Sequence, residues 1–231
     1  MADSPAILLV HGAWHSSACW DKVRAILEAR GRTVYTVDLP TVHAAGKAAL
    51  GLYDDARAVR AAVETAGRPV VVVGHSYGGV PVTQGAAGLP GVVHLVYIAA
   101  FVLDQGESLL SGVGGVQPSW WNVQGDLATA GVPGQSPEWL FYNDLTADAA
   151  RAAAGQLRSQ AVRPFRDPVT AVAWRTVPST YLVTEHDNVF PLEAQLGLAA
   201  RAGSTVRRTG TGHSPFLSRP QETADVIAAA V

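Results

Sequence analysis

The chain of 231 residues has few cysteines, few lysines and few charged residues, and these scarcities exclude several classes of protein. Cys19 is its only cysteine, so no disulfide framework and no cysteine-rich zinc or iron–sulfur site can be built. Only 16% of the residues are charged, and Lys22 and Lys47 are the only lysines. With 17 basic and 19 acidic residues and no polybasic run, we expect neither nucleic acid nor a membrane surface as partner.

Long hydrophobic runs are also missing. The apolar stretches are as long as strands, far short of the roughly 20 residues needed to cross a bilayer. The N-terminal stretch MADSPAILLVHG has neither the basic start nor the long apolar centre of a secretory signal. We therefore expect a cytoplasmic protein, and the sequence leaves its oligomeric state open.

Hydrophobic residues make up 48% of the chain and gather in short runs. The first five runs are mostly apolar and rich in β-branched residues, as is typical of strands buried on both faces. They lie at 6–10, 33–37, 70–73, 92–100 and 180–184. A sixth run at 204–208 is more polar and fits an edge strand.

Helical patterns alternate with these runs. They lie at 17–30, 53–66, 76–87, 193–202 and 220–231, and a glycine follows each of the first four. This alternation predicts an α/β fold with a mainly parallel sheet of about six strands and helices on both faces. We interpret residues 1–231 as a single domain.

One segment, at approximately 102–178, breaks the alternation. It shows no clear strand, has a helical pattern at 147–157, and holds four of the six tryptophans. We expect it to be an insertion over the sheet that forms a small, mostly helical cap.

Residues 74–79 read Gly-His-Ser-Tyr-Gly-Gly and directly follow four valines. A strand, a glycine-rich turn with a central serine and then a helix is the pattern of a nucleophile elbow. Gly74 and Gly78 would relieve crowding in such a turn. The pattern predicts that Ser76 stands at the carboxyl end of a central strand, where open α/β sheets bind ligands.

A serine nucleophile needs a base, and the base needs a carboxylate that orients it. His213 follows the last predicted strand, in a loop that can reach the carboxyl edge of the sheet. Asp187 and Glu185 both follow the preceding strand, and Asp104 follows the strand before that. We favour Asp187 because it lies deeper in its loop, and the order serine, acid, histidine agrees with this choice.

The loop after the first strand, His-Gly-Ala-Trp, is expected to supply part of an oxyanion hole. The predicted donors are the backbone N–H groups of Ala13 and Tyr77. Aromatic residues are expected to form an apolar pocket wall. Each cap ring could equally well attach the cap to the sheet. His15 could equally well structure its own loop. The candidates are Trp14, His15, Trp120, Trp121, Trp139, Phe141 and Tyr142.

Five stretches carry a resemblance to the α/β-hydrolase superfamily over nearly the whole chain: LLVHGAWHSSACW, VVVVGHSYGG, IAAFVLDQGES, STYLVTEHDNVFP and GTGHSPFLSRP. The chain most resembles the small single-domain branch with plant methylesterases, hydroxynitrile lyases and related bacterial esterases. The resemblance implies Ser76, Asp187 and His213 as triad and supports Asp187 over Glu185. The lyases of that branch carry threonine and lysine where this chain has Gly12 and Ser214, which favours ester hydrolysis here.

The expected function is therefore that of a carboxylesterase-like serine hydrolase. It would cleave an ester bond of a small to medium hydrophobic substrate through an acyl-enzyme, with no cofactor and no metal. One alternative is a cofactor-free lyase or another non-hydrolytic triad enzyme, for example in secondary metabolism. Another is a hydrolase-like ligand-binding protein with little turnover.

Overall fold

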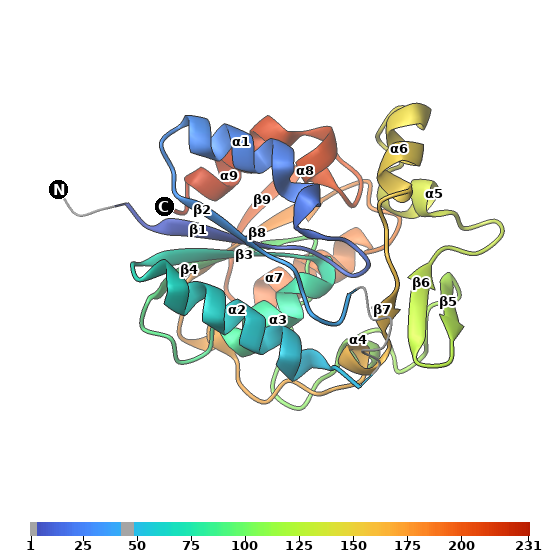
Figure 1. Cartoon of the computed structure of the whole chain (residues 1–231), viewed down its shortest axis with the longest axis horizontal. Coiled ribbons are helices and arrows are strands. Elements are labelled where there is room, and N and C mark those ends of the chain that lie inside the picture. The colour runs from blue at the N-terminus through green and yellow to red at the C-terminus, as the bar shows by residue number, and fades with distance from the viewer. Residues whose placement is uncertain (1–3, 43–48) are drawn as a thin grey trace.

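The centre of the molecule is a sheet of six strands, seen in a computed structural model that describes residues 4–42 and 49–231. All neighbouring strands are parallel, in the order β2-β1-β3-β4-β8-β9 (Figure 1). This confirms the predicted sheet. The strands are β1 (Ala6–Val10), β2 (Val34–Val37), β3 (Val70–His75), β4 (Val92–Ile98), β8 (Ser179–Thr184) and β9 (Thr205–Thr209).

The valines of β3 show why this strand lies in the middle. Val70 and Val72 point into one hydrophobic core, whereas Val71 and Val73 point into the other. All four are fully buried, and each burial stabilises the fold by about 1.5 kcal/mol. In contrast, most of β9 is exposed, in agreement with the edge position predicted from its polar residues.

Helices cover both faces of the sheet (Figure 1). One face packs against α1 (Asp21–Ala29), the short α8 (Pro215–Ser218) and α9 (Pro220–Ala228). The other packs against α2 (Leu52–Ala66), α3 (Gly79–Gly85) and α7 (Leu192–Arg201). The predicted helices therefore form, with ends shifted by a few residues. No helix in the described part of the chain is both long and apolar enough to cross a membrane.

The segment between β4 and β8 differs from the prediction of a mostly helical cap. It contains α4 (Leu109–Gly112), α5 (Pro137–Phe141) and α6 (Ala147–Ala154). It also contains an antiparallel sheet of β5 (Trp121–Gln124), β6 (Leu127–Ala130) and β7 (Gln160–Ala161). The expectation that this segment has no strand is therefore corrected. A two-residue turn, Gly125-Asp126, joins β5 to β6, and this dipeptide is a hairpin signal that the sequence did offer.

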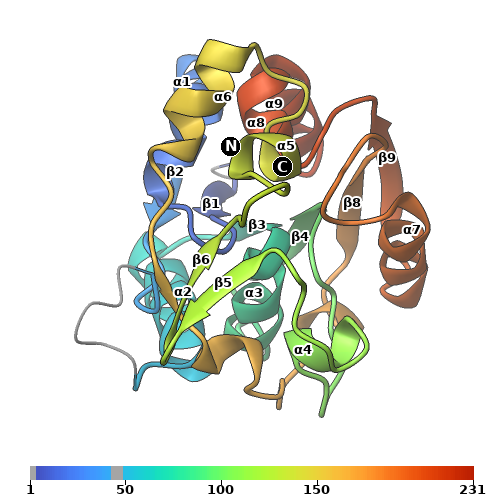
Figure 2. The same ribbon diagram turned by 90° about the vertical axis from the view of Figure 1, so that its right-hand side faces the viewer.

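The cap segment lies beyond the carboxyl ends of the parallel strands, as Figures 1 and 2 show from two sides. Strand β7 connects this segment to the rest of the domain, because the backbone N–H of Ala161 donates to the carbonyl of Thr41 at 2.9 Å. Strand ends and cap therefore enclose the region in which the candidate residues lie.

Candidate active site

Ser76 occupies a sharp turn directly after β3. Its φ is +52°, in the left-handed region that a residue with a side chain rarely adopts. The turn brings backbones very close together, since a Cβ on Gly78 would lie 2.5 Å from the carbonyl oxygen of His11. Only glycine fits at that position. The predicted elbow geometry is thus present. Ser76 lines a cavity at the carboxyl end of β3, a central strand of the sheet.

His213 and Asp187 form a buried pair. Nδ1 of His213 lies 2.7 Å from Oδ2 of Asp187, and the two side chains are 1% and 0% exposed. Because a carboxylate only accepts hydrogen bonds, Nδ1 carries the proton and Nε2 remains available as a base. The hydroxyl of Thr184 and the N–H groups of Val189 and Phe190 also donate to Asp187. These donors fix the carboxylate that in turn orients the imidazole.

The two other carboxylates considered from the sequence lie elsewhere. Glu185 forms an ion pair with Arg208 at 3.3 Å, and Asp104 forms one with Arg175 at 2.5 Å. Each is thus engaged with an arginine on a partly exposed surface. The structure therefore brings Asp187, and neither alternative, to His213.

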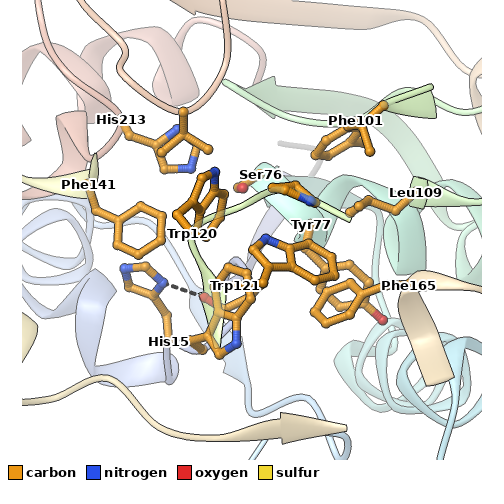
Figure 3. Close-up of a pocket in the computed structure, with 15 residues that line it drawn as sticks. His15, Ser76, Tyr77, Phe101, Leu109, Trp120, Trp121, Phe141, Phe165 and His213 are labelled. Carbon is orange, nitrogen blue, oxygen red and sulfur yellow. Dashed lines mark hydrogen bonds between the residues drawn. The ribbon is translucent and has the colours of Figure 1, made fainter. Parts of the chain in front are cut away.

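Ser76 and His213 line the same cavity (Figure 3). Within the described residues, no hydrogen bond joins their side chains directly. Such contacts are often long without substrate and tighten in the complex with it. The arrangement places a hydroxyl and an oriented imidazole at one apolar cavity.

Ala13 and Tyr77 line the cavity beside Ser76. Neither backbone N–H donates to another group in the described part of the chain. Gly12 permits this closeness, because a Cβ there would lie 2.7 Å from Nδ1 of His75. Both residues that carry these N–H groups therefore lie at the cavity next to Ser76.

The cavity is small, at about 70 Å³, and mostly apolar. Of the predicted wall residues, Trp14, His15, Trp120, Trp121 and Phe141 line it (Figure 3). Six further residues line the cavity that were not predicted from the sequence, since all are apolar and no motif marks them: Phe101, Leu109, Val113, Pro118, Phe165 and Val189.

The placement of Trp139 and Tyr142 in this wall is corrected. Trp139 is 49% exposed, and its backbone carbonyl accepts a hydrogen bond from the Asn188 side chain. Tyr142 is buried behind His15 and lines an adjoining cavity. Helix α5 ends at Phe141, so neighbouring rings point in different directions, which composition alone does not reveal.

His15 is held as a neutral imidazole. Its Nδ1 donates to the carbonyl of Ala13 at 2.8 Å, and its Nε2 accepts from the Tyr142 hydroxyl at 3.0 Å. Burial lowers its pKa to about 3. His15 thus structures the loop that carries Ala13 and also lines the cavity, so both interpretations from the sequence describe part of its role.

The low pKa of His15 predicts a loss of stability in acid. The unfolded state binds a proton at a pKa near 6.5, the folded state only near 3, so stability falls as the pH falls from about 6.5 to 3. At pH 4.5 this one group should lower the free energy of unfolding by roughly 3 kcal/mol. Urea unfolding at pH 7.5 and 4.5 should therefore show a smaller pH effect in His15→Gln than in the wild type. Equal pH effects in both proteins would contradict the assignment.

His11 and His75 each hold a neighbouring loop through one imidazole nitrogen. Nε2 of His75 donates to the carbonyl of His213 at 2.9 Å and so supports the loop of the candidate base. Nε2 of His11 accepts from the N–H of Leu39 at 3.0 Å. Burial lowers the pKa of both imidazoles. In residues 4–42 and 49–231 no three His, Cys, Asp or Glu side chains are grouped as metal ligands.

Comparison with known proteins agrees with the observed fold. Residues 7–226 match the alpha/beta hydrolase family. Methylesterase 2 of Arabidopsis thaliana is 24% identical, over 96% of this chain and 94% of its own. Norfluorocurarine synthase 2 of Strychnos nux-vomica is 27% identical, over 93% of this chain and 91% of its own. The crystal structure of a pyrethroid hydrolase from Sphingobium faniae superposes with a TM-score of 0.84 at 24% identity, covering 97% of this chain and 96% of that one.

These likenesses confirm the resemblance to the methylesterase branch that the sequence motifs indicated. The match to the family covers nearly the whole chain. The chain belongs to the α/β-hydrolase family and is a carboxylesterase-like member of it.

Proposed function

We propose that the protein hydrolyses esters of small hydrophobic acids through a Ser76–His213–Asp187 triad. The observation that carries the proposal is the buried His213–Asp187 pair, which faces the same cavity as the strained Ser76. Serine hydrolysis needs this combination of a hydroxyl at the cavity, an oriented base and a fixed carboxylate.

In the proposed mechanism, Nε2 of His213 takes the proton of the Ser76 hydroxyl as Oγ attacks the ester carbonyl. The backbone N–H groups of Ala13 and Tyr77 stabilise the oxyanion. The tetrahedral intermediate collapses to an acyl-enzyme, and His213 gives its proton to the leaving alcohol. Water then attacks the acyl group with His213 as base, which releases the acid and restores Ser76.

The cavity supports a short apolar acyl group. Its volume of about 70 Å³ lies well below the roughly 300–1,000 Å³ of pockets that hold drug-sized ligands. The rings of Trp14, Trp121 and Phe165 line it, and the ring centroids of Trp121 and Phe165 lie 4.5 Å apart. A chain longer than a few carbons would have to displace these rings.

A series of p-nitrophenyl esters tests the proposal. We expect steady turnover of the acetate and butyrate esters, and a kcat/KM at least tenfold lower for the laurate ester, because the small, ring-lined cavity resists a long chain. A missing methylene contact changes specificity by about tenfold or more, so the contrast is measurable. Stable acylation without turnover would instead indicate a non-hydrolytic enzyme or a ligand-binding protein. A flat chain-length profile would contradict the small acyl site.

A non-hydrolytic reaction on the same triad is the second candidate. The observation that favours it is the Strychnos relative, which is named a synthase although it matches this chain over most of its length. If the simple esters give no turnover while Ser76 is reactive, this candidate takes precedence.

A further inference from the structure

A buried carboxylate lies beneath the proposed oxyanion hole. Asp55 on α2 is fully buried, and its Oδ2 accepts a hydrogen bond from the Tyr77 hydroxyl at 2.6 Å. Thr41 donates to it twice, from Oγ1 at 2.7 Å and from its backbone N–H at 3.0 Å. All these partners are neutral donors. Burying a carboxylate among neutral groups is costly, which suggests that its three bonds have a use beyond filling the core.

The hydrogen bonds continue from Asp55 into the cap. Nε2 of Gln160, on β7, lies 3.0 Å from Oγ1 of Thr41, and Oε1 of Gln160 accepts from the backbone N–H of Trp14 at 3.0 Å. A backbone N–H can only donate, so the orientation of the Gln160 amide is fixed. These hydrogen bonds form a series in which each residue donates to the next, from Trp14 to Gln160, then to Thr41 and finally to Asp55.

The two ends of this series adjoin the two proposed oxyanion donors. Tyr77 carries one of the donating N–H groups itself, and Trp14 directly follows Ala13, which carries the other. Trp14 also has a φ of +62°, a conformation that its surroundings must maintain. The cap holds it further through Ala128, whose carbonyl accepts from the Trp14 indole at 3.1 Å.

We infer that Asp55, Thr41 and Gln160 are positioning residues that hold the Ala13–Trp14 loop and the Tyr77 elbow at the spacing needed to bind the oxyanion. The inference rests on the proposed function, because it concerns the donors of that reaction. It also assigns the cap a part in catalysis besides covering the cavity, since Gln160 comes from the cap sheet.

The chemistry of Asp55 suits this role. An ionised carboxylate offers only acceptors, and burial raises its pKa to about 6, so it is ionised in neutral solution. An amide in its place would turn a donor toward at least one of the three donors that surround it. A displacement of the two N–H groups by a fraction of an ångström weakens transition-state binding more than substrate binding.

A matched pair of variants at Thr41 tests the inference. Thr41→Val keeps the shape but removes the hydroxyl that links Gln160 to Asp55, whereas Thr41→Ser keeps the hydroxyl and removes a buried methyl group. With p-nitrophenyl butyrate we expect Thr41→Val to lower kcat about tenfold and to leave KM within about twofold. The expected loss in kcat is smaller than the roughly 10²–10³-fold loss caused by deletion of an oxyanion donor, because the donors are displaced and not removed. Thr41→Ser should retain more than half of the wild-type kcat. Gln160→Met provides a second break in the same series and should behave like Thr41→Val.

A second readout separates this inference from the proposed function. A fluorophosphonate reacts with an activated serine whether or not the protein hydrolyses esters. Oγ of Ser76 attacks phosphorus as the histidine takes its proton, fluoride leaves, and the phosphoryl oxygen occupies the oxyanion hole. The rate at which the fluorophosphonate reacts with Ser76, followed by intact mass, should fall about tenfold in Thr41→Val and remain near wild type in Thr41→Ser. If the wild type is labelled but does not turn over esters, the proposed function fails and the labelling rates alone decide the inference. Equal losses in the two Thr41 variants, in proportion to their loss of melting temperature, would overturn it.

Discussion

Ser76→Ala is expected to lower kcat for p-nitrophenyl butyrate by about 10⁴- to 10⁶-fold, as deletion of a serine nucleophile does in other hydrolases. The side chain lies at the cavity and its backbone follows the turn that glycines at neighbouring positions permit. Alanine keeps the Cβ, so the fold and its melting temperature should hardly change. The loss should therefore appear in the chemical step.

Ser16→Ala serves as a matched control. Ser16 lies two residues beyond Trp14 and lines the adjoining cavity, away from His213. The kcat of the Ser16→Ala variant should remain close to that of the wild type. If Ser76→Ala kept more than a hundredth of the wild-type kcat, Ser76 would not be the nucleophile.

Asp187→Asn is expected to lower kcat by about 10⁴-fold, close to the effect of the same change in a known triad. The asparagine amide can donate to Nδ1 of His213, which moves the imidazole proton to Nε2, and Nε2 is the atom that must accept the serine proton. The donors from Val189 and Phe190 should still hold the loop, so the cavity should keep its shape. Steady-state kinetics with the butyrate ester measure the effect, and KM should change little.

Glu185→Gln is the comparison for this variant. Glu185 lies two residues away and pairs with Arg208, on a partly exposed surface. Its substitution should leave kcat within about twofold of the wild type, since an exposed ion pair contributes little. Similar losses in Asp187→Asn and Glu185→Gln would indicate damage to the loop rather than loss of the triad acid.

The sheet and its helices could be predicted from the sequence because burial leaves a strong periodic signal. The valines of β3 alternate between two cores, so the whole strand is apolar, and the polar β9 lies at the edge. The cap was harder to predict, since β5 and β6 are four residues long and β7 only two. Treatment of residues 1–231 as one domain, with a cap at 102–178, stays a prediction.

The sequence placed Ser76 and His213 through their positions after predicted strands. It favoured Asp187 over Glu185 by position in the loop and by the family resemblance. The contact itself was not predictable, because the direction of a side chain in a loop depends on its local hydrogen bonds. The buried position of Asp55 could not be predicted for a similar reason. Asp55 stands beside Asp54 in the same helix, yet Asp54 pairs with Arg57 near the surface and Asp55 is enclosed by Thr41 and Tyr77.

The most direct test of the account is to observe the acyl group on Ser76. Wild-type protein would be mixed with p-nitrophenyl butyrate, quenched in acid during turnover, and analysed by intact mass and peptide mapping. The account predicts a transient butyryl adduct on the peptide that contains Ser76, which disappears as substrate runs out and never forms in Ser76→Ala. Steady release of p-nitrophenol with no adduct, or with an adduct on another residue, would contradict it.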